Sequence, residues 1–454
     1  MDEPENASAD APWKQLKSLI DTRDLASINE FLSQLQLTDT ARAISRLPHY
    51  NQIQLINLLS PEDAADILEE VTDEQAADIL EELTPEKAAA IVDELYSDHQ
   101  ADILTLLDAE DAAAILNQFD TEDAEELRTM MSYPDNVAGG LMITEFLSYP
   151  GSYTVQQVLN DLAKNREEYA HYEVHYVYVT KSNDKLIGVL RLRDIFLAPR
   201  KRRLHELMVS RPSSCKLSTP LYRMDQFFDH HSFSGLPVVD DNGILEGVVQ
   251  REDIKEAIAQ NAESAYLKAS GIVGGEELRH LPVWVRSGRR LSWLSINIVL
   301  NLIAASAIAM NQDVIEQITV LAVFLPMISD LSGCSGNQAV AVSIRELALD
   351  LIRPGEYFHV FLKELSVGLI NGFVMGCLLA LVAFIWKGDP ILGIVVGMGL
   401  GINTLLSVVV GGLIPLLLKR FKVDPALASS PLLTTITDMV GFFLTLTLAR
   451  VALL

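Results

Sequence analysis

Five apolar stretches in the last third of the chain are the feature that most constrains its fold. Each is about 20 residues long or longer, the length of α-helix that crosses the hydrocarbon core of a bilayer. Because no water reaches a backbone inside lipid, such a stretch must satisfy its own hydrogen bonds as a helix. We therefore predict an α-helical membrane domain over residues 286–454, with five transmembrane helices at 291–310, 315–344, 365–386, 391–418 and 427–454.

Acidic residues are concentrated ahead of this membrane domain. Only 10 of the 61 Asp and Glu residues lie after residue 280, so the first 280 residues carry a net charge of −27 and the remainder carries +1. An acidic surface lacks the basic footprint that binds nucleic-acid phosphates. We therefore expect no nucleic-acid partner and favour cations as ligands.

Basic residues beside the predicted spans indicate which side of the membrane faces the cytosol. In the short connections, Lys387 alone lies on one face, whereas nine basic residues lie on the other. By the positive-inside rule the N-terminus is cytosolic and the C-terminus lies on the outer face. The nine residues are Arg286, Arg289, Arg290, Arg345, Arg353, Lys363, Lys419, Arg420 and Lys422.

A sequence repeat with a step of twelve residues runs from about residue 60 to residue 128. Alanines such as Ala65 and Ala77 recur in phase, as do isoleucines such as Ile67 and Ile79. Units open with capping residues, for which we take Ser60, Thr72, Thr84, Ser97 and Thr121. This pattern predicts short helices stacked as an all-α superhelical N-terminal domain, which we assign to residues 1–132.

The pattern changes over residues 133–258, where β-branched runs alternate with amphipathic segments. The order of strand, turn, strand and helix occurs once around 176–195 and again around 235–254. This α/β spacing resembles a tandem pair of CBS domains, at about 137–198 and 203–258. A long connecting helix over 259–285 is then expected to lead into the membrane domain.

Polar residues interrupt the last predicted span on a single face. Ser430, Thr434 and Asp438 are spaced four residues apart. A carboxylate inside hydrocarbon costs at least about 2.5 kcal/mol, so we expect Asp438 to face a wet cavity or a cation rather than lipid. The alternative is a protonated Asp438 in an interhelical hydrogen bond. Asp424 lies fourteen residues earlier, about 21 Å along a helix, which corresponds to a cytoplasmic mouth.

The second predicted span carries a further group of polar residues. Asn337 and Asp330 are candidates to line a pore, although Asn337 could equally be a polar contact between helices. Oxygen ligands and isolated carboxylates suit a hard divalent cation, and Mg²⁺ in particular keeps several of its waters. One carboxylate per chain is few for such a charge, so we expect a homodimer that brings two copies of Asp438 together.

The order of these parts resembles the MgtE magnesium transporter family over essentially the whole chain. The most specific motifs are Asp424-Pro-Ala, Ser430-Pro431, Thr434-Thr435 with Asp438, and Gly336-Asn-Gln338. The resemblance implies a channel or transporter for Mg²⁺ uptake across the inner membrane, with a cytosolic regulatory module and a dimeric pore. It also implies that Asp438 binds hydrated Mg²⁺, that Asp424 sits at the cytoplasmic mouth, and that Ser430, Thr434 and Asn337 line the pore.

Two departures from the family bear on regulation. In the connecting helix, Asn261, Ser264 and Ala265 replace acidic residues. Asp253, Glu256 and Glu263 are left, of which Asp253 and Glu256 are candidate ligands for regulatory Mg²⁺. We therefore expect cytosolic Mg²⁺ to gate this chain weakly. CBS sites for adenine nucleotides prefer Ser or Thr three residues before the Asp. Here Arg191 precedes Asp194 and Gln250 precedes Asp253, so we expect no nucleotide to bind.

A proton-coupled carrier and an enzyme are the two other classes of function that the sequence could indicate. A proton-coupled carrier for Mg²⁺, Mn²⁺ or Co²⁺ would use Asp438 to bind a proton and a cation in turn. An inverted repeat would favour a carrier, and the five spans show none. An enzyme is not expected, because the sequence has no paired nucleophile and base and no phosphate-binding glycine loop.

Overall fold

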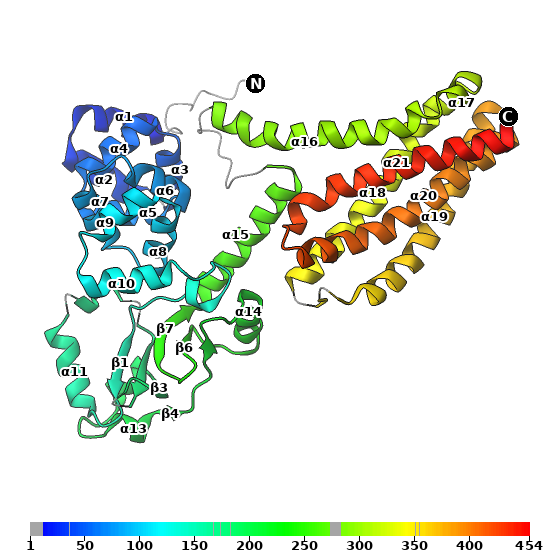
Figure 1. Cartoon of the computed structure of the whole chain (residues 1–454). Helices are drawn as coiled ribbons and strands as arrows, with labels where there is room; N and C mark the ends of the chain where they lie inside the picture. The colour runs from blue at the N-terminus through cyan, green and yellow to red at the C-terminus, as the bar shows by residue number, and fades with distance from the viewer. Residues whose placement is uncertain are drawn as a thin grey trace, which may run out of the picture. The chain divides into compact units, whose positions relative to one another are not determined.

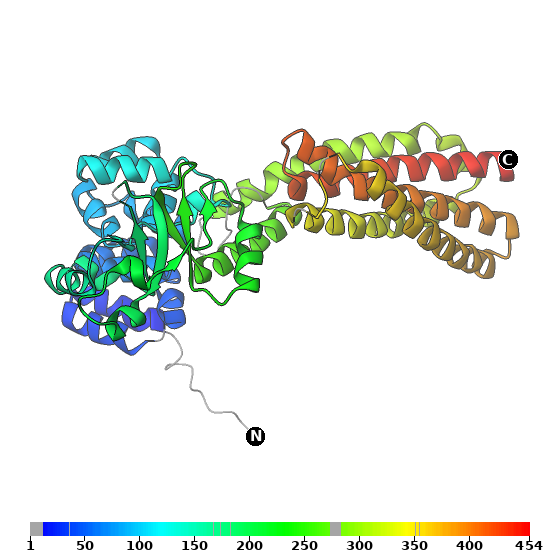
Figure 2. The same cartoon turned by 90° about the horizontal axis from the view of Figure 1, so that it is seen from below.

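The computed structural model describes residues 12–35, 37–166, 168–172, 174–181, 183–272, 283–349, 351–353 and 355–454. The chain forms two compact units, Met1–Gln260 and Asn261–Leu454. Figures 1 and 2 show both units from two directions.

Short helices stack in the first part of the first unit, as the repeat predicts (Figure 1). The in-phase isoleucines from Ile67 to Ile115 are buried in one continuous core, together with alanines such as Ala65 and Ala77. The helices are α1 (Pro12–Thr22), α2 (Leu25–Gln34), α3 (Leu37–Ser45), α4 (His49–Leu58), α5 (Pro61–Glu69), α6 (Asp73–Leu80), α7 (Pro85–Val92), α8 (Ser97–Leu106), α9 (Ala109–Leu116) and α10 (Thr121–Met130).

The capping residues agree with the prediction only in part. The hydroxyls of Ser60 and Thr72 accept hydrogen bonds from backbone N–H groups at the starts of α5 and α6. Ser97 and Thr121 are instead the first helical residues of α8 and α10, so the prediction that they are caps is wrong. The Ser97 hydroxyl donates to Glu145 Oε2 over 2.9 Å, and this long-range contact takes the place of a local cap.

Two small sheets follow, and they repeat one pattern. The first has the strand order β1-β2-β3-β4 and the second β5-β6-β7, and in each a parallel pair is followed by an antiparallel pair. The predicted strand pairs are β2 with β3 and β6 with β7. The strands are β1 (Leu147–Pro150), β2 (Tyr176–Thr180), β3 (Leu186–Arg191), β4 (Val209–Ser210), β5 (Cys215–Lys216), β6 (Gly235–Val239) and β7 (Leu245–Gln250).

Helices connect these strands and complete the α/β repeat. They are the 3-10 helices η1 (Ala138–Gly140) and η2 (Glu168–His171) and the α-helices α11 (Val155–Lys164), α12 (Leu192–Leu197), α13 (Leu204–Leu207) and α14 (Leu221–His230). A longer helix, α15 (Arg251–Ala269), starts directly after β7 and continues into the second unit. α15 covers only residues 259–269 of the connecting helix expected over 259–285; α16 begins at Val283, and residues 273–282 lie outside the described part.

Long helices make up the rest of the second unit, and α18 to α21 lie side by side in both views (Figures 1 and 2). Within the described residues, four helices are long and apolar enough to cross a membrane: α16, α19, α20 and α21. The bounds are α16 (Val283–Ala309), α17 (Gln312–Gln317), α18 (Leu321–Ala348), α19 (Tyr357–Lys387), α20 (Pro390–Arg420) and α21 (Pro425–Leu453).

The second predicted span differs from the structure at its start. The expected helix over 315–344 is interrupted between α17 and α18, which begins at Leu321. α18 has 28 residues, which is long enough to cross a bilayer. Because it carries more polar residues, it is not one of the four helices that are apolar enough to do so.

Glycines allow α19 and α20 to pack with their backbones close together. A Cβ atom added to Gly376 would lie 2.7 Å from the Gly397 carbonyl oxygen, and one added to Gly401 would lie 2.9 Å from the Gly372 carbonyl oxygen. Small residues are the usual means of close helix approach in membrane bundles. The α19–α20 interface therefore depends on having no side chain at these positions.

We predict that Gly376→Ala destabilises the bundle, because its methyl group would overlap the backbone of α20 at a cost of about 1 to 3 kcal/mol. Gly333→Ala in α18 is the matched control, since no atom lies within 4 Å of its added Cβ. Thermal unfolding of the full chain in detergent would compare the two. Equal melting temperatures for both variants would contradict this account of the interface.

Candidate functional site

Asp438 lies in the middle of α21 with 9% of its surface exposed. Its Oδ1 atom accepts a hydrogen bond of 2.5 Å from the hydroxyl of Ser329 on α18. The intramembrane acid predicted from the sequence is therefore held between two helices of the bundle. Oδ1 is used within the chain, whereas Oδ2 has no hydrogen-bond partner among the described residues and is available to another ligand.

A buried polar network joins α18 to α20 one turn from Ser329. Asn403 Nδ2 donates to Ser332 Oγ over 2.6 Å, and the Ser407 hydroxyl donates to the Ser332 carbonyl oxygen over 2.6 Å. Among the described residues, Asn403 Oδ1 is buried without a hydrogen-bond partner. Polar atoms in such a place are costly unless they are satisfied, so they indicate a specific role.

Sequence reasoning missed Ser329, Ser332, Asn403 and Ser407. A signal was available, because Asn403 and Ser407 are spaced four residues apart in an otherwise apolar span. The spacing places both on one face of α20, but the partner helix is known only from the fold.

Ser430 and Thr434 lie on α21 as predicted, about two turns and one turn before Asp438. Both line a cavity at the start of the helix, and the Thr434 hydroxyl donates to the Ser430 carbonyl oxygen over 3.0 Å. The two candidates on α18 differ from them. Asp330 is exposed, and the side-chain oxygen of Asn337 is buried without a hydrogen-bond partner in the described part of the chain.

Asp424 caps the N-terminus of α21. Its Oδ1 atom accepts from the backbone N–H of Ala426 over 2.9 Å. Its Oδ2 atom forms an ion pair of 3.2 Å with Nζ of Lys268, near the end of α15. The side chains of both residues are nearly half exposed. The expected mouth residue thus has a lysine ammonium beside it, which the sequence alone did not suggest.

Asp253 lies at the start of α15, where its Oδ2 atom accepts from the backbone N–H of Gln250 over 3.2 Å. Burial raises its pKa to about 7, and the nearby charge of Asp98 adds to the effect. Glu256, the other candidate on this helix, is exposed. The two predicted regulatory ligands therefore have different surroundings.

Asp253 belongs to an acidic cluster with Asp98 and Asp102 of α8. Burial raises the pKa of Asp98 to about 6, and burial with neighbouring acids raises that of Asp102 to about 8. His99 lies among them, and its Nδ1 atom is 3.8 Å from Oδ1 of Asp73. This pairing raises the pKa of His99 to about 10, so an imidazolium neutralises part of the cluster.

The described residues contain no group of three or more His, Cys, Asp or Glu arranged to hold a metal ion. In the described part of the chain, the acidic cluster of Asp98, Asp102 and Asp253 is thus not shaped as a closed metal cage.

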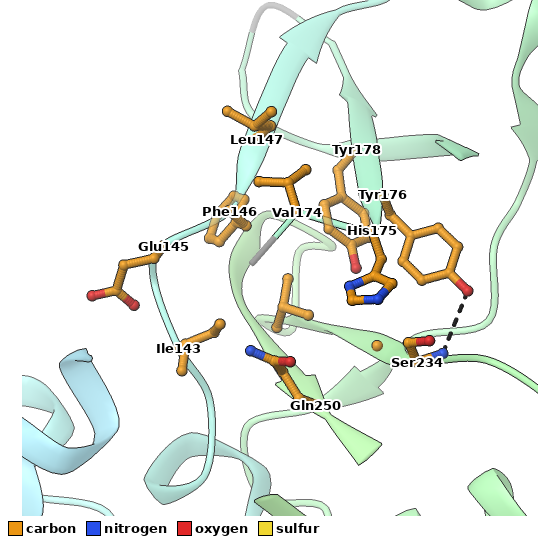
Figure 3. Close-up of a pocket in the computed structure, with 12 residues that line it drawn as sticks. Ile143, Glu145, Phe146, Leu147, Val174, His175, Tyr176, Tyr178, Ser234 and Gln250 are labelled. Carbon is orange, nitrogen blue, oxygen red and sulfur yellow. Dashed lines mark hydrogen bonds between the residues drawn. The ribbon is translucent and has the colours of Figure 1, made fainter. Parts of the chain in front are cut away.

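A small pocket between the two sheets is shown in Figure 3. Tyr176 and Tyr178 of β2 face Ser234 and Gln250 across it, and the backbone N–H of Ser234 donates to the Tyr176 hydroxyl over 3.4 Å. Glu145 is also at the rim, where its carboxylate accepts from the N–H and hydroxyl of Ser97. The rings of Tyr176 and Tyr178 thus line the pocket between the two repeats.

These features define a multi-pass membrane protein with two units. The first unit holds the helical repeat and the two α/β repeats, and the second is a helix bundle with a buried carboxylate. Family profiles match three parts of the chain. Residues 35–136 match the MgtE intracellular N domain, residues 138–201 and 204–260 match the CBS domain, and residues 325–448 match MgtE, described as a divalent cation transporter.

Curated relatives match most of the chain. The magnesium transporter MgtE of Bacillus subtilis is 31% identical over 319 residues, which are 70% of this chain and 70% of that protein. The magnesium transporter MgtE of Thermus thermophilus is 31% identical over 332 residues, 72% of each chain. The chain therefore belongs to the MgtE family.

Solved structures match the first unit. The crystal structure of the soluble part of a magnesium transporter is 26% identical, with a TM-score of 0.50. The match covers 55% of this chain and 98% of the solved chain. The cytosolic domain of the Mg²⁺ channel MgtE in complex with ATP is 27% identical, with a TM-score of 0.50, and covers 54% of this chain and 99% of that one.

We predict that the first unit loses stability as the pH rises from about 4 to 8. The folded-state pKa values of Asp98, Asp102 and Asp253 lie above the ordinary value of 3.8, so the unfolded chain releases these protons first. The pairing of His99 acts in the same direction, because its stabilisation is complete below about pH 6.5 and is lost as the pH approaches 10.

Asp253→Asn should flatten this loss, because the buried group no longer ionises. Glu256→Gln on the same helix is the control, since that side chain is exposed. Scanning calorimetry of the full chain between pH 5 and pH 8 would compare the slopes. The same slope for Asp253→Asn and the wild type would refute the assigned cause.

Proposed function

We propose that this protein carries Mg²⁺ across a membrane, with its first unit acting as a cytosolic regulatory module. The relatives that share about 70% of the chain are magnesium transporters, and the first unit resembles the cytosolic domain of a Mg²⁺ channel. The observation that carries the proposal is the carboxylate of Asp438, which is buried in the helix bundle with one oxygen held by Ser329. Membership of a transporter family also means that the protein is not an enzyme.

The finer architecture belongs to the same proposal. We propose that α18 is a fifth transmembrane helix, because its 28 residues extend about 42 Å and residues such as Ser332 and Gly336 are buried in the bundle. Five spans put the two ends of the chain on opposite sides. The basic residues of the connections then favour a cytosolic N-terminus and an outer C-terminus in the inner membrane.

A homodimer would complete the bundle. Only 11% of an 18-residue apolar stretch of α16 is buried within the chain, so most of this helix is open to a partner. One carboxylate per chain is also few for a divalent cation, and a dimer supplies two. In the proposed dimer two copies of Asp438 face one ion, and the exposed Asp330 lies on the surface available to a partner copy or to water.

The proposed binding chemistry is that of a hydrated ion. Mg²⁺ gives up its waters reluctantly, so the free Oδ2 of Asp438 would accept hydrogen bonds from water on the ion as well as neutralise its charge. The Ser329 hydroxyl keeps Oδ1 in place, which restricts how the carboxylate turns. Ser430, Thr434 and Asn337 would supply neutral oxygens along the path, and Asp424 would attract cations at its mouth.

Regulation is proposed to depend on charge in the first unit. Mg²⁺ near Asp253 and Glu256 would relieve repulsion within the acidic cluster, although Asn261, Ser264 and Ala265 offer it few further charges, so gating by Mg²⁺ should be weak. A relative's cytosolic domain was solved with ATP. In this chain Arg191 and Gln250 stand at the discriminating positions, and we propose that adenine nucleotides do not bind.

Uptake of Mg²⁺ into proteoliposomes tests the function. We expect Asp438→Asn to lower uptake by at least about tenfold, which corresponds to about 1.4 kcal/mol of lost stabilisation of the ion. Glu316→Gln, an exposed residue of α17, is the control for loss of a carboxylate. Wild-type uptake in Asp438→Asn would exclude the assignment. Uptake that needs an imposed proton gradient would favour a proton-coupled carrier.

The ion pair at the mouth makes a separate prediction. Because Lys268 and Asp424 are nearly half exposed, their pairing adds only about 0 to 1 kcal/mol to stability. The positive charge of the Lys268 ammonium nevertheless competes with an incoming cation for Asp424. Lys268→Met should therefore increase uptake at low Mg²⁺ while leaving the melting temperature almost unchanged. Lys255→Met, exposed on the same helix, serves as the control, and equal uptake by both variants would count against the competition.

A further inference from the structure

Asn403 is completely buried in the middle of α20, where its carboxamide lies between α18 and α21. Its Nδ2 atom donates to Ser332 Oγ on α18 over 2.6 Å. On the other side, a Cβ atom added to Gly441 of α21 would overlap this same carboxamide. One side chain of α20 therefore contacts both of the helices that carry Asp438 and its hydrogen-bond donor, Ser329.

The two contact points lie one helical turn from the carboxylate and from its donor. Ser332 follows Ser329 by three residues on α18. Gly441 follows Asp438 by three residues on α21. Residues three apart share a face of an α-helix. The carboxamide of Asn403 thus packs against the same helix faces that form the 2.5 Å hydrogen bond between the Ser329 hydroxyl and Asp438 Oδ1.

The hydrogen bonds of Ser332 fix how the carboxamide is turned. The Ser332 hydroxyl lies 2.6 Å from the carbonyl oxygen of Ile328 and 3.1 Å from that of Ser329, and it donates its one hydrogen to this pair. It can therefore only accept from Asn403, so Nδ2 must face Ser332. Because the same hydroxyl contacts the backbone of Ser329, the position of Asn403 is passed on to the residue that holds Asp438.

Ser407 holds α18 at a second level. It lies one turn after Asn403 on α20, and its hydroxyl donates to the Ser332 carbonyl oxygen over 2.6 Å. A Cβ atom added to Gly336, one turn after Ser332, would overlap the Ser407 hydroxyl. Two hydrogen bonds from α20 to one residue of α18 resist both sliding and rotation of α18. They therefore keep the Ser329 hydroxyl in its position.

An amide is unfavourable at this position if packing is its only purpose. Oδ1 of Asn403 is buried without a hydrogen-bond partner in the part of the chain that the structure describes, and an unsatisfied buried acceptor lowers stability. A leucine of similar volume would fill the space without that acceptor. Because Asn403 has no exposed surface, its carboxamide also does not reach an ion beside Asp438. Its role is therefore to place other residues.

The orientation of a carboxylate affects which divalent cation it suits. With Oδ1 held by Ser329, Asp438 presents one oxygen, Oδ2, to a ligand. One oxygen is sufficient for Mg²⁺, which keeps several waters and is bound through few carboxylates. Ca²⁺ has a flexible coordination geometry and accepts both oxygens of one carboxylate. A carboxylate that turns freely would therefore favour Ca²⁺ relative to Mg²⁺.

We propose that Asn403 is a positioning residue that acts through Ser332 and Ser329. It holds the carboxylate of Asp438 with one oxygen presented, and so it disfavours Ca²⁺. The inference rests on the proposed function, because it concerns the ion preference of the same carboxylate. It gives α20 a part in ion discrimination through α18 and α21.

Competition between the two ions tests this role in the full-length protein in proteoliposomes. The measured quantity is the ratio of the Ca²⁺ concentration that halves Mg²⁺ uptake to the Mg²⁺ concentration for half-maximal uptake. We expect Asn403→Leu to lower this ratio about two- to tenfold, the range that loss of one neutral hydrogen bond gives. Thr404→Val is the control, because it removes a neighbouring hydroxyl that is also buried and has no partner among the described residues. It should leave the ratio unchanged, and an equal fall in this control would count against the specific role of Asn403.

Two further variants separate positioning from a general loss of packing. Ser332→Ala removes the linking hydroxyl with little change in volume and should lower the ratio in the same way, even if Asn403→Leu does not fold. Ser329→Ala should lower the ratio too. Adding Asn403→Leu to Ser329→Ala should then have no further effect, because both act through one hydrogen bond. A general packing defect would instead add to the effect of Ser329→Ala.

The outcomes for the positioning role and for the proposed function are distinct. A wild-type ratio in Asn403→Leu and Ser332→Ala, or additive effects in the double variant, would overturn the positioning role. The proposed function is judged by Asp438→Asn. If that variant loses Mg²⁺ uptake while Asn403→Leu and Ser332→Ala keep the wild-type ratio, the positioning role fails and the function stands. Wild-type uptake by Asp438→Asn refutes the function itself.

Discussion

The cost of placing polar groups in a low-dielectric bundle is the constraint on which the second unit depends. A carboxylate in hydrocarbon is tolerated only with a hydrogen-bond donor, water or a cation beside it. Asp438 obtains its donor from Ser329 on α18, and the amide of Asn403 obtains one acceptor from Ser332. These contacts require α18, α20 and α21 to lie close together, and Gly336 and Gly441 permit that approach because they have no side chain to separate the helices.

The first unit meets the opposite difficulty, an excess of like charges. Most acidic side chains of the helical repeat can remain in water, but Asp98, Asp102 and Asp253 are partly buried and repel one another. The imidazolium of His99 offsets part of this repulsion. Positive charge placed beside these carboxylates therefore lowers their mutual repulsion, as the imidazolium of His99 does.

The parts of the fold that follow from local periodicity were predictable. Ile67 and Ile79 recur every twelve residues and are buried, and the β-branched runs at Tyr176–Thr180 and Gly235–Val239 are strands. The roles of single polar residues were less predictable. Ser97 resembles a helix cap in sequence, yet its hydroxyl donates a hydrogen bond to Glu145, which is 48 residues away along the chain. The fold brings this carboxylate close enough to compete with the local backbone for the hydroxyl.

The amino-acid sequence alone was sufficient for four long apolar helices, the acidic repeat and the paired α/β units, because each depends on hydrophobicity, charge and spacing along one helix or strand. The tertiary structure decided which groups meet: Ser329 with Asp438, and Lys268 with Asp424. These pairs come from different helices, and no local periodicity encodes the rotation of one helix relative to another. That rotation is set by packing of complete side-chain surfaces, such as the glycine contacts between α19 and α20, and it exists only once the chain has folded.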